Sequence, residues 1–125
     1  MGNAANYYAG VCYMHLGKYE TAIEYFEDFD SDDPMVGAMS INLIGDAYME
    51  LGDMEEALDH YLEAAEQADN EFLSPVFLMK AGQTYELMNN YQEAINVYKR
   101  IESEFYNTQQ QRDIEKYIKR CEMKQ

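Results

Sequence analysis

The sequence contains no tryptophan and has few residues of the types that usually bind metals or form disulfides, with two histidines and two cysteines in 125 residues. His15 and His60 have no second histidine, cysteine pair or carboxylate at a metal-ligand spacing, so no metal site is expected. Cys12 and Cys121 lie near opposite ends of the chain, and an internal disulfide is not expected. No apolar run of about 18 residues is present, which predicts that no helix spans a membrane.

Basic residues are also scarce, with 9 Lys and Arg against 24 Asp and Glu, a net charge of −15. Residues 1–71 carry 17 acidic side chains and one basic side chain, whereas residues 72–125 carry 7 acidic and 8 basic ones. The acidic field repels phosphate backbones and anionic lipid, so neither nucleic-acid binding nor membrane contact by this segment is expected. The same field favours a basic partner, although a purely solubilising role explains it equally well.

Catalytic motifs are absent. The serines do not lie in a nucleophile elbow, and no glycine-rich phosphate loop occurs. The acidic run at residues 28–33 lacks the glycine and the final glutamate of a calcium loop. Neighbouring carboxylates such as Glu55 and Glu56 are typical of solvated helix faces, and no apolar setting that would raise a pKa accompanies them. The chain is therefore predicted not to be an enzyme and to bind no cofactor.

What the sequence does contain is a pattern that recurs three times, 35 and then 37 residues apart. Each copy has a glycine, a tyrosine three residues later, a helix-breaking residue, and then a second amphipathic run with an alanine and an aromatic residue. The members are Gly10, Tyr13, Gly17, Ala22 and Phe26; Gly45, Tyr48, Gly52, Ala57 and Tyr61; and Gly82, Tyr85, Asn89, Ala94 and Tyr98. Glycine destabilises a helix by roughly 1 kcal/mol relative to alanine, so its repetition indicates close helix packing.

The spacing predicts three antiparallel helix pairs and a final helix. The expected helices cover residues 4–16, 19–29, 38–51, 54–68, 75–88, 91–105 and 109–123. Extra residues near Met35–Gly37 and Asn70–Ser74 are expected to lengthen turns. Ser74 and Thr108 are expected to cap the helices that follow them. The last helix has a one-sided apolar stripe and basic outer faces, which is typical of a terminal cap.

These positions resemble the tetratricopeptide repeat, a helix-turn-helix unit of about 34 residues. The resemblance implies an all-α, right-handed superhelix of about seven antiparallel helices. The repeats are expected at residues 3–36, 38–70 and 75–107, with a capping helix at 108–124, in a single domain spanning 1–125. The first helix is apolar on nearly all sides, which predicts that the chain is a fragment of a longer protein. The repeats are also loosely similar to bacterial tetratricopeptide proteins of the cell envelope, but the compartment is left open between cytoplasm and envelope.

In this family the first helix of each pair lines a concave groove, so the resemblance implies a non-enzymatic scaffold that binds a peptide or protein there. The positions carried over are Tyr7, Val11, Met14, Asn42, Asp46, Met49, Met79, Gln83 and Glu86. Methionine and tyrosine adapt to varied partners, and the acidic positions favour a basic, hydrophobic peptide. The family's clamp for a terminal carboxylate is not expected, because only Lys80 has a suitable side chain among its positions.

Two alternatives remain at this stage. The Met and Tyr residues of the groove could instead belong to the core, since such stripes usually pack. The apolar first helix could also make the chain a structural or self-assembly element, through homo-oligomerisation or packing on preceding repeats.

Overall fold

A computed structural model describes residues 2–105 and 108–125. The described residues form helices and turns only. The helices are α1 (Asn3–His15), α2 (Tyr19–Glu27), α3 (Pro34–Glu50), α4 (Met54–Ala68), α5 (Ser74–Leu87), α6 (Tyr91–Glu104) and α7 (Gln109–Lys124). The expected all-α class and the order of helices are confirmed.

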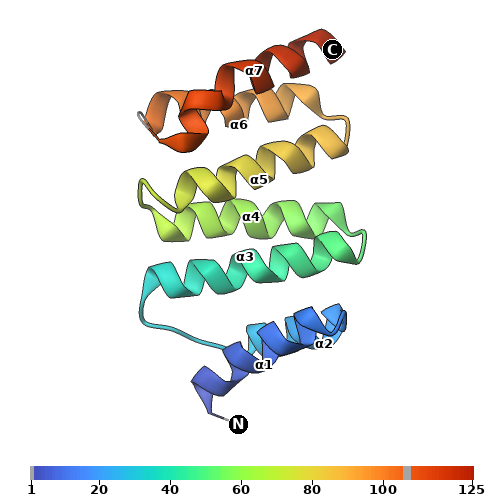
Figure 1. Ribbon diagram of the computed structural model, residues 1–125, viewed down its shortest axis with the longest axis vertical. Coiled ribbons are helices and arrows are strands. Elements are labelled where there is room, and N and C mark those ends of the chain that lie inside the picture. The colour runs from blue at the N-terminus through green and yellow to red at the C-terminus, as the bar shows by residue number, and fades with distance from the viewer. Residues whose placement is uncertain (1, 106–107) are drawn as a thin grey trace.

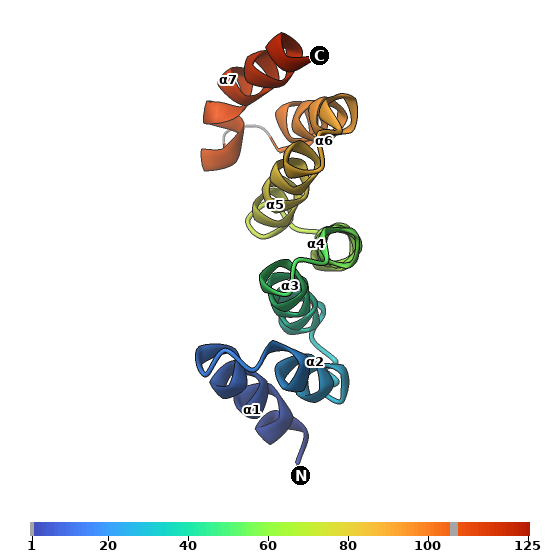
Figure 2. The ribbon, with the colours of Figure 1, turned by 90° about the vertical axis from the view of Figure 1, so that its right-hand side faces the viewer.

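The helices stack along one long axis, with the two ends of the chain at opposite ends of the stack (Figure 1). Each helix packs mainly against its neighbours in sequence, as in a solenoid. Figure 2 shows two layers, with α1, α3, α5 and α7 in one and α2, α4 and α6 in the other. We call the first of these the odd-helix layer. Cys12 in α1 and Cys121 in α7 are both free thiols, in agreement with the distance expected between them.

The repeated glycines lie where the two helices of a pair approach each other most closely. A Cβ atom added at Gly10 would lie 2.5 Å from the ring of Phe26, and one at Gly45 would lie 2.8 Å from the ring of Tyr61. Gly82 faces Tyr98 in the same way. The predicted close packing is therefore confirmed, and the aromatic residue of the second helix fills the space.

The pairs turn at Gly17, Gly52 and Asn89, where the backbone has positive φ values of 74°, 83° and 61°. The left-handed conformation ends each first helix and lets the chain reverse. Glycine has no Cβ and asparagine tolerates this region, which explains why these residue types stand there. The turns predicted at these positions are confirmed.

The start of α3 differs from the sequence expectation. The helix begins at Pro34, so residues 35–37 lengthen the helix rather than a turn. Asp33 is the N-cap, and its carboxylate accepts a hydrogen bond from the Met35 amide at 2.9 Å. Proline fits the first helical turn, where its missing N–H is not needed. The Asp33 cap and Pro34 therefore start the helix at a point where the irregular repeat spacing had suggested a longer turn.

Ser74 is not the cap of α5, because Leu73 occupies that position and Ser74 is the first helical residue. Its buried hydroxyl donates to the Ala65 carbonyl at 2.8 Å and accepts from the Asn70 amide at 3.1 Å. The serine therefore fixes the α4–α5 turn against the end of α4. The cap predicted at Thr108 is confirmed, since its hydroxyl accepts from the Gln111 amide at 3.1 Å.

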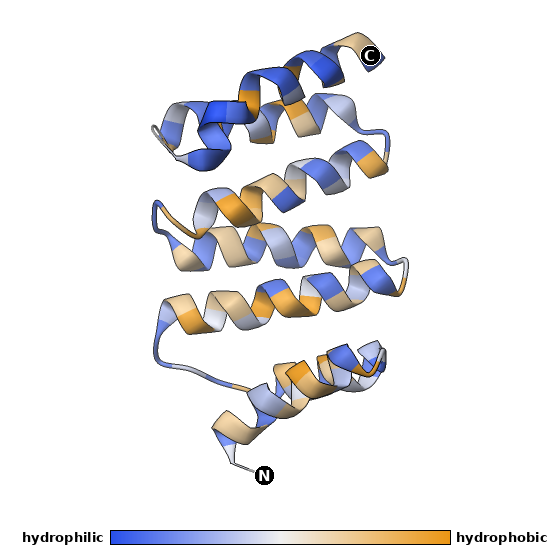
Figure 3. Ribbon diagram, in the orientation of Figure 1, coloured by the Kyte–Doolittle hydropathy of each residue, from blue (hydrophilic) through white to orange (hydrophobic). Residues whose placement is uncertain are grey.

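The last helix closes the stack. α7 contributes three buried residues, Ile114, Ile118 and Cys121, to the core cluster that also contains Tyr98 and Ile101 of α6. The remainder of α7 is largely hydrophilic, as Figure 3 shows. The other end of the stack is more open, because only Gly10 of α1 is buried. α1 is therefore less covered within the described residues than α3 and α5, the first helices of the other two pairs.

Candidate peptide-binding groove

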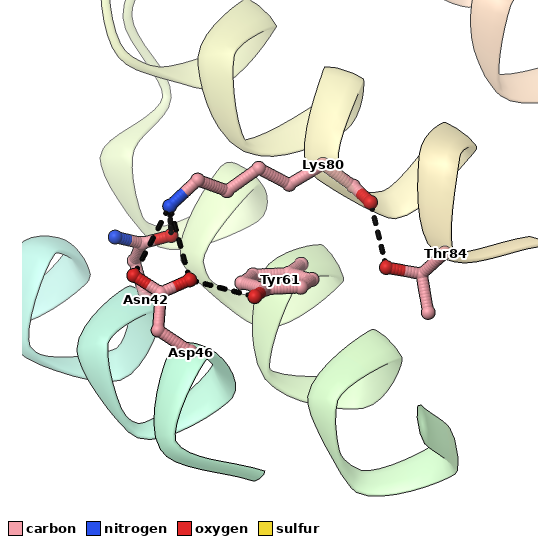
Figure 4. Close-up of polar contacts among 5 residues, drawn as sticks. All are labelled: Asn42, Asp46, Tyr61, Lys80 and Thr84. Carbon is pink, nitrogen blue, oxygen red and sulfur yellow. Dashed lines mark hydrogen bonds and ion pairs between the residues drawn. The ribbon is translucent and has the colours of Figure 1, made fainter. Parts of the chain in front are cut away.

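A network of four polar residues crosses the middle of the odd-helix layer. Tyr61 of α4 donates a hydrogen bond from its hydroxyl to Asp46 of α3 at 2.6 Å. The Lys80 ammonium of α5 donates to both oxygens of Asp46, at 3.1 and 3.2 Å, and to Asn42 at 2.9 Å. Figure 4 shows Tyr61 and Lys80 both bound to Asp46, with Asn42 beside it. We call Asn42, Asp46, Tyr61 and Lys80 the Asp46 network.

The network is half-buried and holds three helices in register. Burial, together with the hydrogen bond to Asp46, raises the pKa of Tyr61 well above its ordinary value. The hydroxyl therefore keeps its proton at neutral pH and remains a donor. The Thr84 hydroxyl donates to the Lys80 carbonyl at 2.7 Å, one turn further along α5 (Figure 4).

A second network repeats the same arrangement one step towards the C-terminus. Tyr98 of α6 donates to Glu86 of α5 at 2.5 Å, and Arg120 of α7 pairs with both carboxylate oxygens of Glu86 at 2.7 and 3.0 Å. The Arg120 guanidinium also lies over the Tyr117 ring, 4.6 Å from its centroid. In both networks, a tyrosine hydroxyl of a second helix and a cation of the next first helix bind one carboxylate.

Burial works to raise the pKa of Glu86, but the hydrogen bonds from Arg120 and Tyr98 and the charge of Arg120 outweigh it, and the net pKa is lowered. A lowered carboxyl pKa in the folded state contributes stability above the unfolded-state pKa, which is lost as the pH falls through the folded value. We expect Glu86→Gln to be less stable than the wild type at neutral pH, with a difference that shrinks as the pH falls below about 4.5. Urea unfolding at stepped pH values measures this. The exposed Glu115→Gln is the matched control, and an unchanged difference across the range would contradict the role of Glu86.

The first repeat carries no such network, because Phe26 stands where the other repeats have Tyr61 and Tyr98. Val11 and Met14 occupy the α1 positions that correspond to Asp46 and Met49 of α3. The odd-helix layer is consequently apolar between α1 and α3. An open depression of about 410 Å³ lies there. Its lining consists of Val11, Met14, His15, Tyr19, Leu43, Asp46, Met49, Glu50 and Tyr61.

A smaller depression of about 260 Å³ lies between α3 and α5, next to the first. Its lining consists of Met49, Tyr61, Lys80, Gln83, Thr84 and Leu87. Because Met49 and Tyr61 border both, the two depressions are adjacent, and residues of the Asp46 network lie at the boundary between them. We call them the α1–α3 depression and the α3–α5 depression, and together the groove.

Most of the nine residues predicted to line the groove meet there. Val11, Met14, Asp46 and Met49 line the α1–α3 depression, and Gln83 lines the other. Asn42 reaches the boundary through its hydrogen bond with Lys80.

The remaining three predicted residues are engaged elsewhere. Tyr7 packs on Phe26 and Phe29, with ring centroids 5.9 and 5.1 Å apart. Met79 packs against the main core cluster, and Glu86 is held by Arg120. The alternative that such residues serve the core applies in part to all five apolar positions, because Val11, Met14 and Met49 also pack against core clusters. Asp46 and Glu86, which the sequence suggested as acidic groove positions, both have cationic partners.

Sequence reasoning missed several lining residues, namely His15, Tyr19, Leu43, Glu50, Tyr61, Thr84 and Leu87. Two of them could have been found by comparing equivalent positions of the repeats. Leu43 corresponds to Lys80 of the next unit, and Glu50 corresponds to Leu87. The Tyr61 ring packs against Gly45, and its hydroxyl also reaches the groove. Only the three-dimensional arrangement shows this dual role.

The described residues include no group of three or more His, Cys, Asp or Glu side chains placed to bind a metal ion. In the same residues, no helix combines the length and the apolar character required to cross a bilayer.

Fold and groove define a helical-repeat scaffold of the protein-interaction class. Two sequence models described as tetratricopeptide repeat match the chain, at residues 4–34 and 37–102. The second match covers more than half of the chain, and the protein belongs to the tetratricopeptide repeat family. Members of this family are interaction scaffolds rather than enzymes, and a protein partner is thereby expected.

Among solved structures, the chain is similar to two crystal structures of MamA. The first has a TM-score of 0.66 at 19% identity and covers 98% of this chain and 78% of that one. The second has a TM-score of 0.66 at 20% identity and covers 98% of this chain and 73% of the other. At these identities the likeness concerns the fold. A search of curated proteins gave no significant match.

Proposed function

We propose that the groove binds a peptide segment of a protein partner, with one apolar side chain of that segment inserted into the α1–α3 depression. The observation that carries the proposal is the depression itself, about 410 Å³ in volume and open to solvent. Its apolar contacts come from Val11, Met14, Leu43 and Met49. Flexible methionine side chains reshape around differently shaped ligands, which suits peptide recognition.

Charge supports a basic residue beside the apolar anchor. Glu50 lines the depression and, in contrast to Asp46, has no ion pair among the described residues. The surrounding first two repeats are strongly acidic. A lysine or arginine next to the anchor would therefore lie in a favourable field, and its contribution would weaken with salt. The same field opposes nucleic acid as a ligand.

The proposal predicts that Met49→Ala weakens peptide binding by about tenfold, because truncating a central apolar contact typically costs more than 1 kcal/mol. Binding would be measured on a peptide array and then by fluorescence anisotropy at two salt concentrations. The matched control is Met123→Ala, since Met123 is 86% exposed on α7. Tyr7→Ala is a poor control because Tyr7 packs on Phe26. Equal binding by the wild type, Met49→Ala and Met123→Ala, or no binding by any of them, would contradict the proposal.

A second candidate function is self-association through α1. The supporting observation is that Tyr8 and Leu16, two large apolar residues of this end, are 69% and 68% exposed. Exposed residues of this kind favour contact with another protein surface. Sedimentation of the chain at high concentration separates the two candidates, because a monomer would contradict self-association and leave the groove as the proposed site.

A further inference from the structure

Lys80 is the Lys or Arg residue that lines the groove, and its charge is compensated by an ion pair with Asp46. The side chain lines the α3–α5 depression at the boundary with the α1–α3 depression. Its ammonium donates to Asn42 and Asp46 and lies 5.4 Å from the centroid of the Tyr61 ring. The Lys80 and Asp46 side chains are 33% and 32% exposed, so the pair is accessible from the groove without being fully solvated.

Removing the charge of Asp46 would change the lining of the groove from net negative to neutral, because Lys80 and Glu50 would remain as its charged residues. Lys80 would then present an uncompensated positive charge between the two depressions. Arg120, further along the odd-helix layer, would stay paired with Glu86. In the wild type, by contrast, Asp46 cancels Lys80, and the carboxylate of Glu50 determines the local field.

We infer that Asp46 is a specificity-determining residue: by holding Lys80, it makes the groove select segments with a basic residue beside the apolar anchor and reject acidic ones. The inference rests on the proposed function, because it assigns the charge selection of the same groove. Specificity arises here from a repulsive element as well as an attractive one, since an acidic ligand meets Glu50 and finds no available cation.

The test uses two synthetic peptide sets with the same central Leu, Met or Phe, flanked by Lys in one set and by Glu in the other. The wild type is expected to prefer the Lys-flanked set by about fivefold, as for a single partly exposed charge contact. Asp46→Asn keeps an acceptor for the Tyr61 hydroxyl but removes the charge that compensates Lys80, and should abolish the preference. Asp59→Asn is the matched control, because Asp59 is exposed on α4 in the other layer. It should keep the wild-type preference.

A second measurement follows Lys80 without any ligand. The rate at which an acylating reagent modifies Lys80, determined by mass spectrometry, should rise severalfold in Asp46→Asn and stay unchanged in Asp59→Asn. An unchanged rate would overturn the inference, because Lys80 would not be held by Asp46. The inference also fails if both peptide sets bind and Asp46→Asn leaves their ratio unchanged, although the proposed function would survive. If neither set binds, both fail.

Discussion

Replacing Gly82 with alanine is expected to lower the free energy of unfolding by about 2 kcal/mol, even though alanine is the better helix former. The added methyl group would collide with the ring of Tyr98, which is fully buried. The ring has little freedom to move away, because its hydroxyl is bound to Glu86 and its edge packs in the main core cluster. Urea unfolding followed by circular dichroism measures the change.

The same substitution at Gly37 is the control. A Cβ there would meet only the end of the Gln67 side chain, which is flexible and has room to move. Gly37→Ala should therefore stabilise α3 by up to about 1 kcal/mol, the gain in helix propensity. Opposite signs at the two positions are the expected result. A stabilising Gly82→Ala would show that the close approach between α5 and α6 is not required.

Replacing Ile114 with alanine is expected to cost about 3 kcal/mol, as is typical when a buried large aliphatic side chain is truncated. Ile114 has no exposed surface and belongs to the cluster that contains Tyr98 and Ile101. α7 is the last helix of the stack, so the cavity would open at the element that covers α6. A solenoid is stabilised by the interfaces between neighbouring helices, so no large central core compensates for the packing lost between α6 and α7.

Met123→Ala on the same helix provides the comparison, because Met123 is 86% exposed. Its effect should lie within about 0.5 kcal/mol of zero. Thermal unfolding of the two variants distinguishes them directly. Equal stability of Ile114→Ala and the wild type would mean that α7 is not held by its apolar stripe.

Several parts of the fold could be predicted because they depend on local rules. The glycine and aromatic positions recur at a fixed spacing, so close helix packing at Gly45 could be predicted, although the structure alone shows that the ring packed there is that of Tyr61. The turn residues Gly17 and Asn89 tolerate the conformation that the reversal requires. The predicted start of α3 and the predicted cap at Ser74 were both wrong. In both places the residue type is common in turns and also in the first turn of a helix, so the sequence does not distinguish the two.

The groove could be predicted only in part. Val11, Met14 and Met49 follow from helical periodicity and from the family pattern, and they lie together. Tyr7 does not line either depression and packs on the Phe29 ring instead. Asp46 lines the same depression, but its charge is compensated by a cation that comes from 34 residues further along the chain. No periodic rule within one helix specifies such a partner.

The sequence by itself determined the helices, their pairing and the family, because each depends on residues within one repeat or on the spacing between repeats. The tertiary structure decided which carboxylates of the odd-helix layer are neutralised and where the layer is hollow. Both outcomes depend on side chains that different repeats contribute to one place. The apolar α1–α3 depression and the Asp46 network differ because Val11, Phe26 and Leu43 stand at the positions that Asp46, Tyr61 and Lys80 occupy one repeat later.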